Sequence, residues 1–195
     1  YYNVKNLNTS LERLKSAGSI FFLLPGPKMI WQFGEVGYDI SIDYNGRLGR
    51  KPIKWNYLNE LNRKNIYNTW SYLIGLRKKH SIFSDPQSKI DTWLNSSIKK
   101  IQYSLGEENA ILITNFDVKT LQTSVSLPSA GHWYHATLGE KIYIEDNELD
   151  VSIPAGTFLL MTDFEIDYLP KGQAKLSVEE IIMPKSLTLH SNYPN

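Results

Sequence analysis

Cysteine is absent from this sequence of 195 residues. Its absence excludes disulfide bonds, thiolate catalysis and cysteine-based metal sites. An excess of either charge is also missing, because 21 lysine and arginine residues offset 20 aspartate and glutamate residues and leave a formal net charge of +1. Such a chain would release few counterions from a polyanion, so nucleic acid is not expected to be its main partner.

Long apolar runs are missing as well. The longest, at residues 20–24, has five residues and is followed by Pro25-Gly26, whereas a transmembrane helix needs about 20 apolar residues. We therefore expect no membrane span. The first residues do not form a signal peptide and lack an initiator methionine, so we expect the chain to begin inside a longer protein or after a cleavage.

What is present is an ordinary globular composition, with 42% hydrophobic and 21% charged residues. Two segments have the period of an amphipathic helix. Leu7, Leu11 and Leu14 form one stripe in residues 6–18, and Gly18 is expected to end that helix. The second helix is predicted at residues 62–80, where the apolar stripe consists of Ile66, Trp70, Leu73 and Ile74.

Between these helices, residues 28–33 predict a strand. The run is mostly apolar rather than alternating, which is typical of a strand buried on both faces of a parallel sheet. Residues 34–61 then form a long loop, and loops of that length in compact domains usually have a function. The order helix, strand, loop, helix is that of an α/β repeat.

After residues 84–92 the pattern acquires a period of two, as Leu121, Thr123, Val125 and Leu127 show. Similar short runs are separated by turn residues and lie at 98–105, 109–115, 132–137, 141–144, 148–153 and 157–163. This spacing predicts an antiparallel β-sandwich. The chain is thus predicted to be an α+β chain of two parts, at residues 1–84 and 92–184, with a polar tail at residues 185–195.

Few residues suggest chemistry. Glu35 and Asp39 follow the predicted strand directly, where barrel folds keep their active sites, but either carboxylate could instead pair locally. His132 and His135 are three residues apart and would point to opposite faces of a strand, so no metal site is expected. Trp133 and Tyr134, with Trp93, could stack on sugars or belong to the core.

One segment resembles a known family. Residues 24–35 read LPGPKMIWQFGE, which is similar to the eighth barrel strand of the α-amylase family, glycoside hydrolase family 13, although Pro27 follows Gly26 without the extra residue that many members have. Three later runs resemble the C-terminal domain of that family, namely ILITNFD at 111–117, GHWY at 131–134 and IPAGTFLL at 153–160. The resemblance covers about residues 5–165.

The resemblance implies the last βα portion of a (β/α)₈ barrel followed by a Greek-key β-sandwich. The parent protein would hydrolyse α-glucans such as starch, glycogen or maltooligosaccharides. Its three catalytic carboxylates would lie upstream, so this chain would have no catalytic residue, and the alternative is a non-catalytic glucan-binding or structural module. Gln32, Glu35 and Tyr38 would contact substrate.

The same resemblance bears on ligands and location. No cofactor or metal is implied for this chain, with calcium a candidate only for the parent protein. The expected partners are an α-glucan, the upstream barrel of the same protein, and a second copy bound through residues 1–84, unless that half docks on the sandwich. Residues 189–195 resemble the start of a sorting domain for type IX secretion, which would place the bacterial parent at the cell surface or outside the cell; an ordinary polar tail is the alternative.

Overall fold

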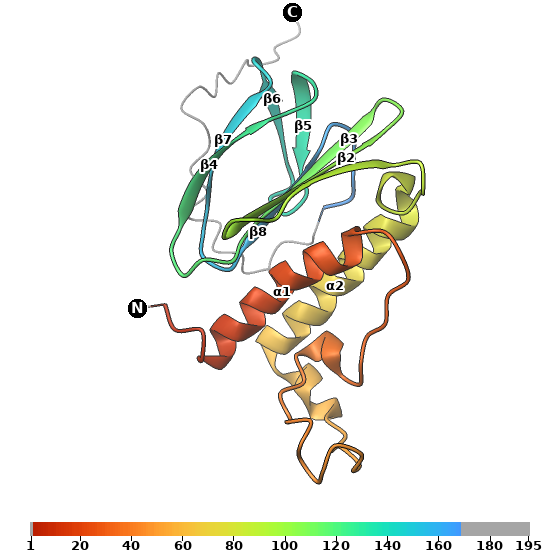
Figure 1. Ribbon diagram of the computed structural model, residues 1–195, viewed down its shortest axis with the longest axis vertical. Coiled ribbons are helices and arrows are strands. Elements are labelled where there is room, and N and C mark those ends of the chain that lie inside the picture. The colour runs from red at the N-terminus through yellow and green to blue at the C-terminus, as the bar shows by residue number, and fades with distance from the viewer. Residues whose placement is uncertain (1, 169–195) are drawn as a thin grey trace, which may run out of the picture.

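The computed structural model describes residues 2–168 (Figure 1). Its helical elements are α1 (Leu7–Leu23), α2 (Leu61–Lys79) and three 3₁₀ turns, η1 (Gly34–Val36), η2 (Trp55–Asn59) and η3 (Ser81–Phe83). The strands are β1 (Lys89–Trp93), β2 (Ile98–Leu105), β3 (Glu108–Asn115), β4 (Leu121–Ser126), β5 (Gly131–His135), β6 (Glu140–Ile144), β7 (Glu148–Ile153) and β8 (Phe158–Thr162).

The strands form two sheets in which every pairing is antiparallel. Six strands follow the order β1-β2-β3-β8-β5-β6, and β4 pairs with β7 in the second sheet. In the central strand β3, Ala110 and Leu112 contribute to a core shared with the helices, while Ile111 and Ile113 contribute to a core shared with β4 and β7. This alternation buries both faces of β3 and produces three layers.

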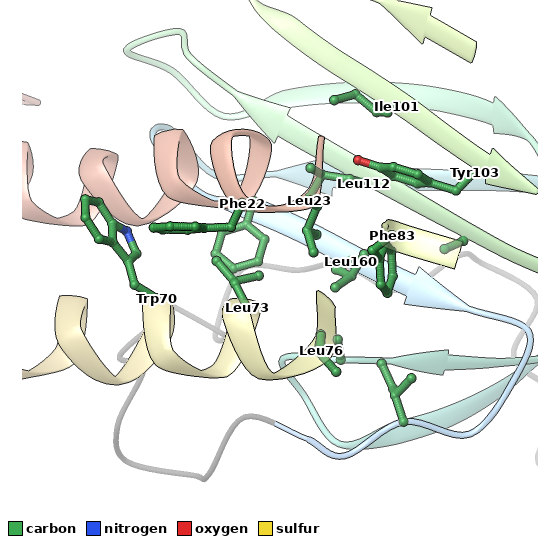
Figure 2. Packing of buried hydrophobic residues seen from close by; sticks show 14 of the residues in the cluster. Phe22, Leu23, Trp70, Leu73, Leu76, Phe83, Ile101, Tyr103, Leu112 and Leu160 are labelled. Carbon is green, nitrogen blue, oxygen red and sulfur yellow. The ribbon is translucent and has the colours of Figure 1, made fainter. Parts of the chain in front are cut away.

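The helices pack directly on the larger sheet. Figure 2 shows Phe22 and Leu23 of α1 and Leu73 of α2 in one cluster with Leu112 and Leu160 of the sheet. The two helices lie side by side below the sheets in Figure 1, with the segment between them on the side away from the sheets. Docking of the first half on the sheets is one of the two outcomes expected for residues 1–84.

The first helix is longer than the sequence suggests. Asn6 caps its N-terminus by accepting hydrogen bonds from the amides of Asn8 and Thr9, and the helix passes through Gly18 to Leu23. The expectation that Gly18 ends it is wrong. A Cβ atom at Gly18 would lie 2.1 Å from Nε1 of Trp70, so this glycine allows α2 to approach α1 closely instead of ending the helix.

The C-terminus of α1 is stabilised from the neighbouring helix. α1 has no basic residue in its own last turn. Arg77 of α2 supplies the charge by donating hydrogen bonds to the carbonyl oxygens of Phe22 and Leu24, and it also reaches those of Gly26 and Phe83. A cation at this position complements the helix dipole and satisfies carbonyl groups that have no partner within the helix.

The prediction of a buried strand at residues 28–33 is wrong. This segment is extended or in turns and pairs with no strand among residues 2–168. Met29 is 77% exposed and Trp31 is 67% exposed. A strand of a sheet needs at least one hydrogen-bonded neighbouring strand, and the described residues supply none, so the helix–strand–helix portion is a helix–loop–helix.

The seven later strands are confirmed within two residues at each end. The period-two pattern missed β1 because this edge strand is largely exposed and lies before residue 92 for most of its length. The polar tail at 185–195 and the sorting motif lie outside the described residues. The Greek-key path remains a prediction.

Candidate functional site

The segment between α1 and α2 is organised by aromatic side chains. Phe33 stacks on Tyr38 with ring centroids 5.9 Å apart and contacts Trp55 edge to face at 4.8 Å. Phe33 has a φ of 56°, which is the left-handed region that bulky residues rarely adopt. The surrounding packing, which includes Val36 and Tyr57, holds the backbone in this conformation. The two ends of the long loop are therefore joined by a small aromatic cluster.

Arg63 of α2 anchors this loop. Its guanidinium donates to Asp39 at 3.0 Å and to Glu60 at 2.8 Å, and it also donates to the carbonyl oxygen of Gly37. The guanidinium carbon lies 3.7 Å from the ring centroid of Tyr57, which is a cation–π contact. Arg63 is almost fully buried, so the loop and helix are joined by a largely desolvated cation.

The same contacts decide the role of Asp39. Partial burial alone would raise the pKa of its carboxyl group, but hydrogen bonds from Tyr57 and Arg63 outweigh that effect and lower the pKa. Burial and the Asp39 carboxylate together raise the pKa of Tyr57 to about 12. Asp39 is thus a paired structural carboxylate, which was the local alternative left open from the sequence, and it is not poised to donate a proton.

Two of the three predicted substrate-binding residues line one groove. Gln32 and Tyr38 share it with Trp31 and with the loop around Arg50, and its volume is about 630 Å³. The Tyr38 hydroxyl donates to the carbonyl oxygen of Pro52 at 2.6 Å and so joins the two arms of the loop. Glu35 lies in η1 and does not line this groove.

A second groove is almost entirely apolar. It runs between α1 and the 28–34 segment, has a volume of about 430 Å³, and is lined by residues that include Phe21, Met29, Ile30 and Trp70. Among residues 2–168, fourteen of the nineteen exposed large hydrophobic side chains precede residue 84. Unusual apolar exposure is therefore concentrated in the helical half of the molecule.

The aromatic residues of β5 do not form a stacking surface. Trp133 is fully buried in the core between the sheets, and its indole nitrogen donates to the carbonyl oxygen of Ser129. Tyr134 packs partly against the helix-side core, whereas Trp93 is half exposed. The idea that Trp133 stacks on sugars is wrong, and the core alternative is correct for this residue.

The histidines of β5 face opposite ways, as their spacing predicts. His132 is exposed, and His135 is buried with its Nδ1 accepting a hydrogen bond from the Leu138 amide at 3.1 Å. Within residues 2–168, no group of three or more histidine, aspartate and glutamate side chains gathers where it could hold a metal ion. In that range no helix is both long and apolar enough to cross a membrane.

Sequence reasoning missed the Arg63 anchor. Arg63 was placed outside the apolar stripe of its helix, where lysines and arginines are normally solvated. Its partners Gly37 and Asp39 are more than twenty residues away in the sequence, and nothing in the local pattern connects them. The Glu60–Arg63 spacing of three residues was the single local signal available.

No protein-family model and no curated protein sequence matches this chain. Solved structures do match. The chain has the fold of part of an α-amylase. It is similar to an Anoxybacillus α-amylase with a TM-score of 0.57 and 15% identity, over 78% of this chain and 32% of that protein. The α-amylase of Geobacillus thermoleovorans, solved in complex with acarbose, matches with a TM-score of 0.61 and 13% identity, over 78% of this chain and 33% of that protein.

A third solved structure agrees. AmyP, solved in complex with maltotriose, matches with a TM-score of 0.62 and 15% identity over 79% of this chain and 35% of that protein. Identities this low support the shared fold alone. The chain spans about a third of the length of the α-amylases that it matches.

Proposed function

We propose that this chain is the C-terminal portion of an α-amylase-like glycoside hydrolase that acts on α-glucans. The observation that carries the proposal is the difference between the two matched shares, because about four-fifths of this chain matches only about a third of each solved structure. The segment that resembles the eighth barrel strand, residues 24–35, also comes before the two-sheet part, in the order that such a portion requires.

The exposed apolar groove supports this assignment. Met29 and Ile30 expose large apolar surfaces although the sequence pattern marks residues 28–33 as a buried strand. In the longer enzyme, the preceding part of the barrel would cover these side chains. Removing each of these side chains from water would stabilise the longer enzyme by roughly 1–2 kcal/mol. The upstream barrel is therefore the proposed partner of this face.

In this proposal the chain contributes to substrate binding without performing catalysis. Gln32 and Tyr38 line the larger groove, which supports them as sugar contacts. Glu35 remains proposed on the sequence resemblance alone. The hydrolysis itself, with retention of configuration through a covalent glycosyl-enzyme intermediate, would depend on carboxylates in the upstream part of the parent protein. We further propose that the parent is exported from a bacterial cell.

The two-sheet part has a structural role in this proposal. Arg13 of α1 donates hydrogen bonds to the carbonyl oxygens of Phe116 and Asp117, and Ser16 donates to that of Gly156 at 2.6 Å. Together with the core shared by the helices and β2, β3 and β8, these bonds fix α1 against the sheet. The sheets would thus support the end of the barrel.

Hydrolysis assays test the proposal directly. Soluble starch is incubated with this chain and, separately, with the longer polypeptide encoded in the same reading frame, and the release of reducing sugar is measured. We expect activity from the longer polypeptide alone. Activity from residues 1–195 by themselves would overturn the non-catalytic role, and a longer polypeptide inactive on α-glucans would overturn the assignment.

A further inference from the structure

The groove that contains Gln32 and Tyr38 has an unbalanced charge. Arg47, Arg50 and Lys51 line it, and no carboxylate does. Of the nearby acids, Asp39 pairs with Arg63, whereas Asp43 pairs with Arg47 and offsets that one charge, which leaves Arg50 and Lys51 without a carboxylate partner among the described residues. Residues 44–59 contain four lysine and arginine residues and no aspartate or glutamate. The groove therefore presents a positive potential to any ligand that enters it.

The basic wall is already formed without a ligand. Lys51 donates hydrogen bonds through Nζ to the carbonyl oxygens of Tyr44 and Gly46, at 2.7 and 2.6 Å. A Cβ atom at Gly49 would lie 1.7 Å from the carbonyl oxygen of Asn45, so the turn closes tightly on itself. A ligand would pay little conformational entropy to order this loop.

The opposite wall has the groups that recognise a sugar. Trp31 exposes two-thirds of its surface and offers a flat face to a ring. Gln32 is exposed and can hydrogen-bond hydroxyl groups through its amide. The Tyr38 ring is held in place because its hydroxyl donates to Pro52. One wall thus suits a pyranose ring and the other suits an anion.

We propose that this groove binds an α-glucan that carries a phosphate ester, with Trp31 stacked on a glucosyl ring and Arg50 as the principal phosphate ligand. Arg50 takes part in no ion pair among the described residues, whereas Arg47 pairs with Asp43 and the Lys51 ammonium is held by two carbonyl groups. A guanidinium can bind phosphate with two parallel hydrogen bonds. This inference rests on the proposed function and names the substrate class of its groove.

Matched dextrins provide the test. Phosphorylated amylopectin dextrins are divided into two samples, one of which is treated with phosphatase, and binding of each to the 195-residue chain is measured by calorimetry. We expect the phosphorylated sample to bind about tenfold more tightly, in line with a charge-assisted hydrogen bond. The preference should shrink at 0.5 M salt, because the contact is exposed.

Variants locate the site. Arg50→Gln should abolish the preference for phosphorylated dextrin, and Arg50→Lys should retain part of it. Lys119→Gln removes an exposed cation from the turn after β3 and should change nothing. Arg50 lies on an exposed loop, so loss of binding without any change in the circular dichroism spectrum would identify a lost contact.

Several results would overturn this inference. They are equal binding of both dextrin samples, no binding of either, a preference that persists in Arg50→Gln, or orthophosphate binding as tightly as the dextrin. None of them bears on hydrolysis by the longer polypeptide, which is judged in its own assay. Failure of the phosphate site and failure of the glycosidase assignment are therefore distinguishable.

Discussion

Replacing Gly18 by alanine should destabilise the protein, although alanine is the better helix former. In an open helix interior this change would stabilise by about 1 kcal/mol. At Gly18, however, the new Cβ would lie 2.1 Å from Nε1 and 2.7 Å from Cδ1 of Trp70. The indole cannot remain where it is, because it packs edge to face on Phe22 at 5.0 Å and donates a hydrogen bond to the Leu14 carbonyl oxygen.

The magnitude follows from these contacts. Overpacking of this kind costs roughly 1–3 kcal/mol, and loss of the indole hydrogen bond adds about 1 kcal/mol. After subtracting the gain in helix propensity, we expect Gly18→Ala to lower the free energy of unfolding by about 1–3 kcal/mol. Gly75→Ala is the matched control, since it lies inside α2 with nothing within 4 Å of its Cβ position. It should raise stability by about 1 kcal/mol.

Urea unfolding followed by tryptophan fluorescence and circular dichroism measures both variants. Adding Trp70→Leu to Gly18→Ala should remove the clash, so the two substitutions should be non-additive. The reasoning would be refuted if Gly18→Ala and Gly75→Ala stabilised the protein equally. It would also be refuted if the double variant showed no coupling between the two positions.

Three further predictions concern pH, the end of α1 and the apolar groove. Burial lowers the pKa of His135 from 6.5 to about 4. The unfolded state therefore binds the proton more tightly, and the folded state loses stability as the pH falls from about 6.5 towards 4. By pH 5 the free energy of unfolding should have fallen by about 2 kcal/mol. His135→Asn retains an acceptor for the Leu138 amide but does not titrate, so its unfolding free energy should fall less between pH 7.5 and 5, and identical losses would contradict this. Arg77→Met should lower the free energy of unfolding in urea by about 2–4 kcal/mol, because it leaves three partly buried carbonyl groups without this donor, and an effect below about 0.5 kcal/mol would show that these bonds contribute little. The double change Met29→Gln and Trp31→Gln should reduce concentration-dependent self-association in sedimentation experiments, and an unchanged dissociation constant would place any contact between copies elsewhere.

The strands were predictable because their signal is local. Alternation in residues such as 121–127 reflects the two faces of a single strand, so neighbouring residues suffice to detect it. The segment 28–33 failed for the opposite reason, since an apolar run does not reveal whether a neighbouring strand is there to pair with it, and none of the described strands does. Gly18 failed because a contact with Trp70, more than fifty residues away, decides its role.

The candidate site was only partly predictable. The family resemblance pointed to Gln32, Glu35 and Tyr38, and two of these residues, Gln32 and Tyr38, line the same groove. The groove itself depends on how the loop folds back, which is fixed by the Tyr38–Pro52 hydrogen bond and by Arg63. Those contacts join residues that are far apart along the chain, and no periodic pattern encodes them.

The core that the helices share with β2, β3 and β8 limits how this architecture can be rearranged. A polypeptide starting at β1 would leave Tyr103, Leu112 and Leu160 facing water on one side of its larger sheet. Recombination could not transfer these strands alone into another protein as an independently folding unit. The pair of helices would have to travel with them, so the inheritable unit is larger than the sheets.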